Sequence, residues 1–323
     1  MTLARKILMA VWPAKFSDIT PQVLQYFWKP VIPFGKVTLI QGDTGIGKTS
    51  LILKILADVS NGIYPPTLYQ GKLQPSVKGE PLRFYYVTAE NDMSDTIVPQ
   101  FIRYNGNMDY ARFQDENKGH FALSGEEIEE CVRVTGARII FIDPWQQFVD
   151  GISPGDNTAI RKLICDVQSA AQKTNTAVII AGNFSKSTQS EIYKGLGGSE
   201  LNNTLRCVLT IRHDPEGNPA VRVLHFTKMS LPDRENTPII IRRDDDGDLS
   251  FETDAQDFFQ LEDEVPSVFL ENALKNGPMD SKTIMSLATA RGFGTGQIYR
   301  ARQKLGVTIE KQSDKSSQWS LPT

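Results

Sequence analysis

The sequence predicts an α/β fold in which a mostly parallel sheet carries helices on both faces and is followed by a small second domain. From Val31 to roughly Phe251, short apolar runs alternate with segments of helical periodicity. The runs are apolar throughout, as in strands buried on both faces of a parallel sheet. Residues 244–264 then carry ten acidic residues and no Lys or Arg, whereas residues 270–323 carry eight Lys or Arg against four Asp or Glu. This change of charge predicts a linker and a separate domain.

Six apolar runs are expected to form strands. They are Val37–Ile40, Arg83–Thr88, Arg138–Ile142, Ala177–Ala181, Arg206–Ile211 and Val221–Phe226. Helices are expected at Ser50–Ala57, directly after the first strand, and at Asn157–Lys173, where apolar residues recur at near-helical spacing. The segment 212–219 has two prolines and a glycine, which favours a hairpin and an antiparallel edge to the sheet.

We expect four segments along the chain: an N-terminal arm at 1–30, the sheet domain at 31–253, an acidic linker at 254–264 and a small domain at 265–323. The arm is rich in aromatic residues, namely Trp12, Phe16, Tyr26, Phe27 and Trp28. They could pack on this chain or on a neighbouring subunit, and packing within the chain is favoured.

Composition excludes several classes of protein. The net charge of −3 over 323 residues is not that of a nucleic-acid-binding polycation. Three cysteines without a C-x-x-C pair indicate neither a disulfide framework nor a zinc site, so a cytoplasmic location is expected. No stretch is long and apolar enough to cross a membrane.

A phosphate-binding loop is the clearest motif of the chain. The pattern G-x-x-x-x-G-K-[ST] is matched after the first strand and before the first helix, the context that such a loop requires. The candidate nucleotide-binding residues are Gly42, Asp43, Thr44, Gly45, Ile46, Gly47, Lys48, Thr49 and Ser50. Lys48 is expected to reach the β- and γ-phosphates of ATP, and Thr49 to hold Mg²⁺. A glycine-rich turn without a ligand is the alternative, and the context disfavours it.

Two carboxylates complete the predicted site. Asp143 ends an apolar strand and is expected to act on Mg²⁺; the alternative is an acid that only caps the strand. Glu90 follows another strand, at the edge where open α/β sheets place their ligands. We assign Glu90 as the base that polarises the attacking water, the alternative being a solvated loop carboxylate.

The order of these motifs resembles a known family. Over residues 31–230 the chain is similar to RecA-like ATPases of the plasmid RepA helicase type, related to DnaB-type hexameric helicases. The elements that carry the resemblance are Gly42–Thr49, Ala89-Glu90, Phe141–Pro144, Asn183–Lys186, Gly197–Ser199 with Arg206, and Lys228. The resemblance implies a RecA-like sheet, ATP and Mg²⁺ as ligands, a homo-oligomeric ring of six subunits, and single-stranded DNA as partner.

The resemblance also assigns roles to single residues. Asn183 stands where the family commonly has a γ-phosphate-sensing His, and an amide cannot titrate. Arg206 and Lys228 match basic residues that the family presents to the nucleotide of the adjacent subunit; surface salt bridges are the alternative. Ser230 replaces an Arg that relatives often carry. Segments 151–156 and 185–198, the second with Lys186, Tyr193 and Lys194, match DNA-contacting loops, although a plain surface loop fits their composition equally well.

The last segment is expected to form three short helices and a two-stranded wing, which resembles a winged helix-turn-helix. Helices are expected at 267–274, 280–291 and 295–305, and the wing at 306–311 and 318–321. The third helix carries polar and basic residues suited to DNA: Gln297, Tyr299, Arg300, Arg302, Gln303 and Lys304. Docking of a replication protein or another subunit is the alternative.

These observations predict an ATP-dependent, ring-forming motor on single-stranded DNA, as in the replicative helicase of a plasmid, phage or other mobile element. One alternative is a non-motor, nucleotide-gated DNA-binding or regulatory ATPase, which the Asn and Ser departures favour slightly. A helicase loader or a defence-system ATPase is a further alternative.

Overall fold

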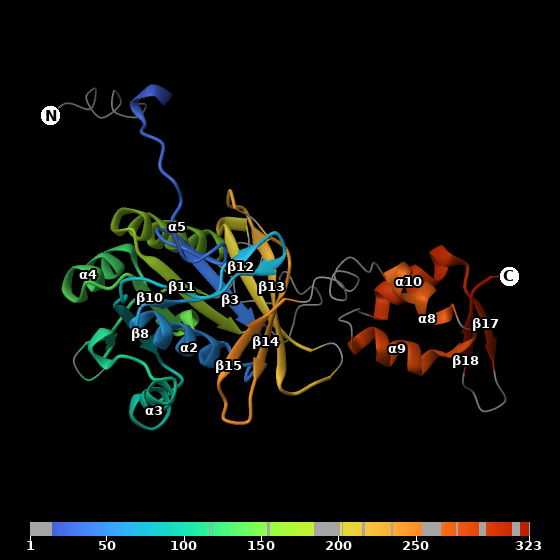
Figure 1. The fold of residues 1–323 in the computed structure, drawn as a ribbon. Helices are drawn as coiled ribbons and strands as arrows, with labels where there is room; N and C mark the ends of the chain where they lie inside the picture. Colours follow the sequence, from blue (N-terminus) through green and yellow to red (C-terminus); the bar gives the residue numbers. More distant parts are fainter. Residues whose placement is uncertain are drawn as a thin grey trace, which may run out of the picture.

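A nine-stranded sheet forms the centre of the protein (Figure 1). In this computed structural model, the described residues are 15–115, 117, 119–153, 156–183, 201, 203–214, 217–233, 235–253, 266–275, 277–290, 295–311 and 317–322. The strand order is β15-β14-β13-β12-β3-β11-β10-β8-β9. The strands span β3 Val37–Gly42, β8 Phe84–Thr88, β9 Ala111–Phe113, β10 Ile139–Asp143, β11 Ala177–Asn183, β12 Cys207–His213, β13 Val221–Met229, β14 Ile239–Arg243 and β15 Leu249–Glu252.

The six strands from β9 to β12 in this order run parallel, and β13, β14 and β15 extend the sheet in antiparallel pairs. The turn between β12 and β13 is the predicted hairpin. The prediction of a mostly parallel α/β sheet with an antiparallel edge is therefore confirmed.

Helices cover both faces of the sheet. They span α2 Lys48–Ser60, α3 Val98–Arg103, α4 Gly125–Thr135 and α5 Asn157–Thr174. Successive side chains of β10 point to opposite faces of the sheet and pack in two separate cores. Phe141 packs on the side of α2 and α3, and Ile142 packs on the side of α4 and α5. Burial of both faces explains why the strands are continuous apolar runs. None of the helices in the described part of the chain is long and apolar enough to cross a membrane.

The N-terminal arm divides into two parts. Strand β1 (Tyr26–Trp28) pairs with β2 (Ile32–Pro33), and Phe27 and Trp28 are buried in the same core as α2. Phe16, in the short helix η1 (Phe16–Asp18), is instead 99% exposed. Packing within the chain thus holds for Phe27 and Trp28 but not for Phe16, and Trp12 lies outside the described residues.

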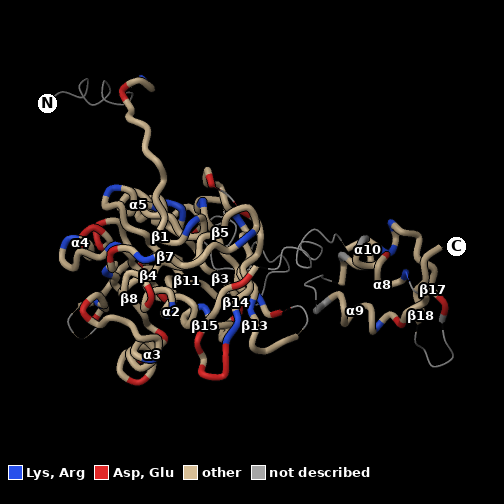
Figure 2. The backbone as a smooth tube through the Cα atoms, in the orientation of Figure 1, with Lys and Arg blue, Asp and Glu red and all other residues tan. Residues whose placement is uncertain are grey.

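Several small elements were not predicted. Two hairpin-like pairs lie between α2 and β8, namely β4 (Ile63–Tyr64) with β7 (Val77–Lys78) and β5 (Leu68–Tyr69) with β6 (Lys72–Leu73). Short helical turns occur at η2 Met93–Ile97, η3 Met108–Tyr110 and η4 Trp145–Phe148. The first acidic residues, 244–248, form the turn between β14 and β15 and lie within the sheet domain (Figure 2). The expected linker at 254–264 lies outside the described residues.

The C-terminal segment has its own small core. Helices α8 (Pro266–Leu274), α9 (Ser281–Ala290) and α10 (Thr295–Leu305) precede the antiparallel strands β17 (Thr308–Lys311) and β18 (Ser317–Ser320). An unpredicted strand, β16 (Met279–Asp280), adds a third strand next to β18. Apolar residues of the three helices gather around Trp319 on β18. Three helices and a hairpin occur in the order that we expected, and the identification as a winged helix stays a prediction.

The two cores predict which aromatic residues stabilise the sheet domain. Phe141 is fully buried and packs against the Tyr86 ring at a centroid distance of 5.2 Å, so Phe141→Ala should cost about 3–5 kcal/mol of unfolding free energy. Phe16→Ala removes the same ring from an exposed position and should leave stability unchanged within about 0.5 kcal/mol. Urea unfolding followed by near-ultraviolet circular dichroism measures both. Equal losses in the two variants would contradict the packing described.

Candidate nucleotide site

The phosphate loop joins β3, in the interior of the sheet, to α2. Gly47 takes a φ of 104° at the N-terminal end of α2, a conformation that favours glycine. At Gly42 the reason is space, because an added Cβ would lie 2.8 Å from the Ile211 carbonyl oxygen on β12. The loop is thus held against the neighbouring strand, and Asp43, Thr44 and Gly45 remain exposed.

The Lys48 ammonium lies within the loop. It donates hydrogen bonds to the carbonyl oxygens of Gly42 at 3.0 Å and Asp43 at 2.8 Å, and the residue is only 7% exposed. Burial lowers the pKa of Lys48, and the carboxylates of Asp143, Glu90 and Asp43 oppose that shift. A buried cation in a loop rich in backbone N–H groups is suited to bind an anionic phosphate.

Thr49 and Asp143 meet at the same edge of the sheet. The Thr49 hydroxyl donates to Asp143 Oδ2 at 2.5 Å, and Asp143, the last residue of β10, is 3% exposed. Burial raises the pKa of Asp143 above its usual range; the Thr49 hydrogen bond and Lys48 lower it, while Glu90 raises it further.

A hydroxyl oxygen and a carboxylate oxygen side by side fit Mg²⁺, which prefers oxygen ligands. The described residues contain no cluster of three or more His, Cys, Asp or Glu that could hold a metal alone. A bound Mg²⁺ would therefore take its other ligands from phosphate and water, as is usual where Mg²⁺ accompanies a nucleotide.

Glu90 lies close to this pair but faces solvent. It comes two residues after β8, lines an open cavity of about 610 Å³ with Thr88 and Asn91, and is exposed. Its charge acts on both Lys48 and Asp143, which places it near the phosphate loop. A carboxylate in an open cavity beside the predicted metal can reach a water molecule, and its role as base stays a prediction.

Asn183 is the last residue of β11 and lies directly opposite Gly42 in the register of the two strands. It is half-buried. Since neighbouring strands are about 4.8 Å apart, Asn183 lies beside the start of the phosphate loop, as a γ-phosphate contact would require.

Arg206 and Lys228 lie at the other end of the sheet. Strand β12 is parallel to β3, with Cys207 opposite Thr38, so Arg206 is at the edge where β3 begins. Lys228 is opposite Val208 on β12 and donates to the Asn203 carbonyl oxygen at 3.1 Å. Burial lowers the pKa of Lys228 and the Arg206 charge lowers it further, so the two cations are neighbours.

The length of β3 separates these cations from the phosphate loop of the same chain. From Thr38 to Gly42 the strand rises about 13 Å, and the loop extends further. The structure thus brings together Lys48, Thr49, Asp143, Glu90 and Asn183, and it keeps Arg206 and Lys228 apart from them.

Sequence reasoning missed two features next to the loop. Gln41 Nε2 donates to Thr210 Oγ1 at 3.2 Å, and that hydroxyl hydrogen-bonds the Thr227 hydroxyl at 2.5 Å, so a polar chain crosses β3, β12 and β13. Arg222 on β13 donates from Nε to the Ile46 carbonyl oxygen at 3.1 Å, which fixes the loop from the side. Polar residues inside apolar strands were the available signal for the first feature.

The predicted DNA-contacting loops are largely outside the described residues. Of the segment 151–156, residues 154 and 155 are not described, and the whole of 185–198 falls in the gap at 184–200. Lys186, Tyr193 and Lys194 therefore stay predictions, as do Gly197 and Ser199.

Comparison with known proteins gives a family for the chain. The family model described as "AAA domain" matches residues 4–189, more than half of the chain. The crystal structure of the KaiC-like protein PH0186 from the hyperthermophilic archaeon Pyrococcus horikoshii OT3 is similar, with 13% sequence identity and a TM-score of 0.47 over 69% of this chain and 91% of that chain. No curated protein matches the chain.

The Thr49 hydroxyl should couple nucleotide binding to Mg²⁺. Thr49→Val keeps the shape of the side chain but leaves Asp143 without its hydrogen-bond donor and the metal without one ligand. The gain in ATP affinity on addition of Mg²⁺ should therefore be about tenfold smaller than in the wild type. Thr49→Ser keeps the hydroxyl and should behave as the wild type. Calorimetric titrations with ATP, with and without Mg²⁺, measure the effect. The same gain from Mg²⁺ in all three proteins would contradict this role.

Proposed function

The chain belongs to the AAA domain family, and on this premise we propose that it is an ATP-hydrolysing, ring-forming motor that acts on single-stranded DNA. The observation that carries the proposal is the division of the site. Lys48, Thr49 and Asp143 gather at one end of the sheet, while Arg206 and Lys228 lie as a pair at the other end.

The residues at the loop would divide the work of hydrolysis. Lys48 and the backbone N–H groups of the loop hold the β- and γ-phosphates, and Thr49 and Asp143 hold Mg²⁺. When bound, the Mg²⁺ ion neutralises charge on the phosphate oxygens. Glu90 orients a water molecule for attack and accepts its proton, and the Asn183 amide hydrogen-bonds the γ-phosphate or the water.

The second half of the site would come from a neighbouring subunit. Head-to-tail contacts bring different surfaces of identical chains together, and they form a ring when the rotation between neighbours closes. Such a contact can place Arg206 and Lys228 of one chain at the phosphate loop of the next, where a guanidinium stabilises the charge of the transition state. A hexamer is the ring that the resemblance to RepA- and DnaB-type helicases favours.

Single-stranded DNA is the proposed track, and replication of a plasmid, phage or other mobile element in the cytoplasm is the proposed setting. The support is the resemblance over residues 31–230, together with the basic side chains of α10 in the C-terminal segment. That segment would contact DNA or a replication protein.

A second candidate is a nucleotide-gated DNA-binding or regulatory ATPase that does not unwind DNA, or a helicase loader. Asn183 in place of His and Ser230 in place of Arg favour it, because each removes a group that could link hydrolysis to movement. Strand displacement on a forked duplex separates the candidates: the motor releases a strand in an ATP-dependent manner, and the regulatory protein only binds.

The proposed base can be tested by its charge. Glu90→Gln should bind ATP with Mg²⁺ normally and hydrolyse it about 10²–10⁴-fold more slowly in the presence of single-stranded DNA. Glu80→Gln is a matched control, since Glu80 is an exposed acid that precedes β8, whereas Glu90 follows it. No ATP hydrolysis by the wild type with Mg²⁺ and single-stranded DNA would overturn the proposed function, whereas full activity of Glu90→Gln would remove only the assignment of the base.

Subunit mixing tests whether the site is shared between chains. Lys48→Ala removes the phosphate-binding cation and Arg206→Ala removes the distant one, so each variant alone should be nearly inactive. In an equal mixture about a quarter of head-to-tail interfaces combine an intact loop with an intact arginine, and ATPase activity should return to that level. A mixture no more active than its two components would contradict the shared site.

A further inference from the structure

A buried tyrosine lies next to Asp143 in the sheet. Tyr86 on β8 is 1% exposed, and its ring packs on Phe141 of the neighbouring strand β10 at a centroid distance of 5.2 Å. In the parallel register of these strands, Tyr86 is opposite Phe141. Thr88, two residues further along β8, is opposite Asp143. Because alternate residues of a strand share a face, all four side chains belong to the face of the sheet that packs against α2.

The Tyr86 hydroxyl is buried without a hydrogen bond. Its oxygen is out of contact with solvent, and no donor or acceptor among the described residues bonds it. Thr88 is near enough to lower the pKa of the phenol, but the contact does not have the geometry of a hydrogen bond. Burying a hydroxyl without a partner is unfavourable for folding, and such groups are few in native proteins. A function is one reason to retain one.

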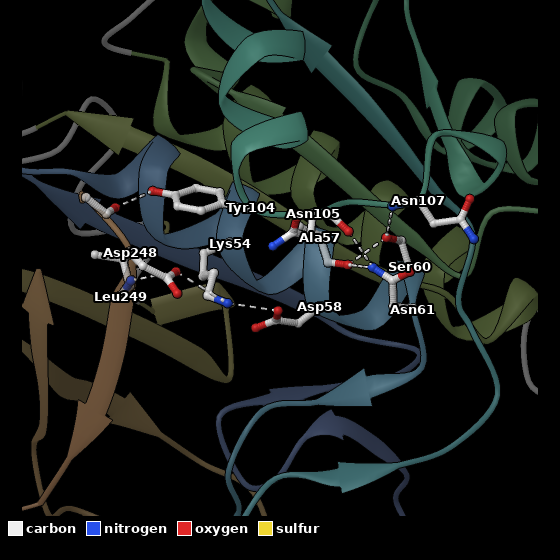
Figure 3. A network of polar contacts seen from close by, with 11 residues as sticks. Lys54, Ala57, Asp58, Ser60, Asn61, Tyr104, Asn105, Asn107, Asp248 and Leu249 are labelled. Carbon is white, nitrogen blue, oxygen red and sulfur yellow. Dashed lines mark hydrogen bonds and ion pairs between the residues drawn. The ribbon is translucent and has the colours of Figure 1, made fainter. Parts of the chain in front are cut away.

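Two other tyrosines near Tyr86 do have partners. The Tyr85 hydroxyl, on the opposite face of β8, donates to Gln114 Oε1 at 2.5 Å. The Tyr104 hydroxyl, in the same core as Tyr86, donates to the Gly247 carbonyl oxygen at 3.4 Å (Figure 3). Tyr86 therefore differs from both neighbours in the bonding of its hydroxyl and not in its burial within the sheet.

The charges around the phenol make it a hydrogen-bond donor. Burial raises the pKa of Tyr86 above its usual range, and the carboxylates of Asp143 and Glu90 raise it further, Asp143 more than Glu90. The hydroxyl therefore keeps its proton at neutral pH and can donate it in a hydrogen bond to a carboxylate. Of the two carboxylates, Asp143 has the stronger effect on the phenol.

Asp143 is short of donors, as Tyr86 is short of an acceptor. The Asp143 residue is 3% exposed, and the Thr49 hydroxyl bonds its Oδ2, which leaves Oδ1 able to accept. Burial raises the pKa of Asp143 although Thr49 and Lys48 both lower it, so the charge of this carboxylate is only partly compensated. Carboxylates that hold a metal are commonly oriented by a further hydrogen bond from a neighbouring group.

We propose that Tyr86 is a positioning residue of the site: when Mg²⁺ and ATP are bound, its hydroxyl donates a hydrogen bond to Asp143 Oδ1 and orients that carboxylate toward the metal. Hydrogen bonds of catalytic groups are often long before the substrate is bound, and they shorten in the complex. The contact with Phe141 holds the ring beside β10, so the donor is in place before the nucleotide arrives. The inference rests on the nucleotide and Mg²⁺ site of the proposed function.

Tyr86→Phe tests this role, because it removes the hydroxyl and keeps the ring. The gain in ATP affinity on addition of Mg²⁺ should be about tenfold smaller than in the wild type, as is usual when a group that orients a metal ligand is lost. ATP binding without Mg²⁺ should not change. The midpoint of urea unfolding without nucleotide should equal or exceed that of the wild type, since no bond is lost and an unfavourable burial is relieved. Calorimetric titration and circular dichroism measure these quantities.

Tyr85→Phe is the matched control from the next position on β8. It removes the same atom, but here the hydroxyl is bonded to Gln114. The midpoint of urea unfolding should therefore fall, whereas the gain in ATP affinity from Mg²⁺ and the rate of ATP hydrolysis should stay as in the wild type. The two variants are thus expected to show opposite patterns of stability and metal dependence.

A lower unfolding midpoint in Tyr86→Phe would show that the hydroxyl is already bonded in the fold, and it would overturn the inference. An unchanged gain from Mg²⁺ would do the same; slower hydrolysis with that gain unchanged would place the hydroxyl at Glu90 instead. A wild type whose ATP affinity does not depend on Mg²⁺ would overturn the inference together with the metal site. These measurements need no turnover, so a wild type that binds ATP with Mg²⁺ but does not hydrolyse it would overturn only the proposed function.

Discussion

The hydrogen-bonded position of β3 between two parallel strands is the constraint on which the rest of the site depends. Its partners β11 and β12 run in the same direction, so their C-terminal ends meet at the phosphate loop. That register places Asn183 beside Gly42 and the Ile211 carbonyl oxygen against the Gly42 Cα. A shift of one residue would exchange the two faces of β3 and send Ile40 from one core into the other.

This arrangement buries two ionisable side chains, which is unfavourable for folding. Lys48 and Asp143 both lose water, and neither loss is offset by apolar packing. The compensation is polar: two loop carbonyls accept from Lys48, and the Thr49 hydroxyl donates to Asp143. Buried ionic groups of this kind contribute little net stability, and at a concave edge of a sheet they are typical of a functional site.

Local patterns were sufficient to predict the central strands, the phosphate loop and the two acids, because each is encoded within a few adjacent residues. Strand β3, for example, was expected at Val37–Ile40 and extends to Gly42. The two-residue strands β4 to β7 have no periodicity to detect. The acidic turn at 244–248 resembles a linker in composition and is held in the sheet by pairing between β14 and β15. The Gln41–Thr210 bond depends on the register between strands, which the sequence does not reveal.

Strand direction also determines which cations of a chain can lie near the γ-phosphate at its own phosphate loop. Arg222 and Arg243 are two described cations that lie beside the loop. Arg222 is engaged by three carbonyl oxygens, and Arg243 lies across β3 from Asp143. Neither is placed to meet charge that develops on a γ-phosphate near Asp143. Arg206 and Lys228 form a cationic pair that their own chain keeps at a distance from its loop. In the proposed ring, this pair would supply a cation to the phosphate loop of the neighbouring chain. Assembly would then be a condition for hydrolysis and not only a consequence of nucleotide binding.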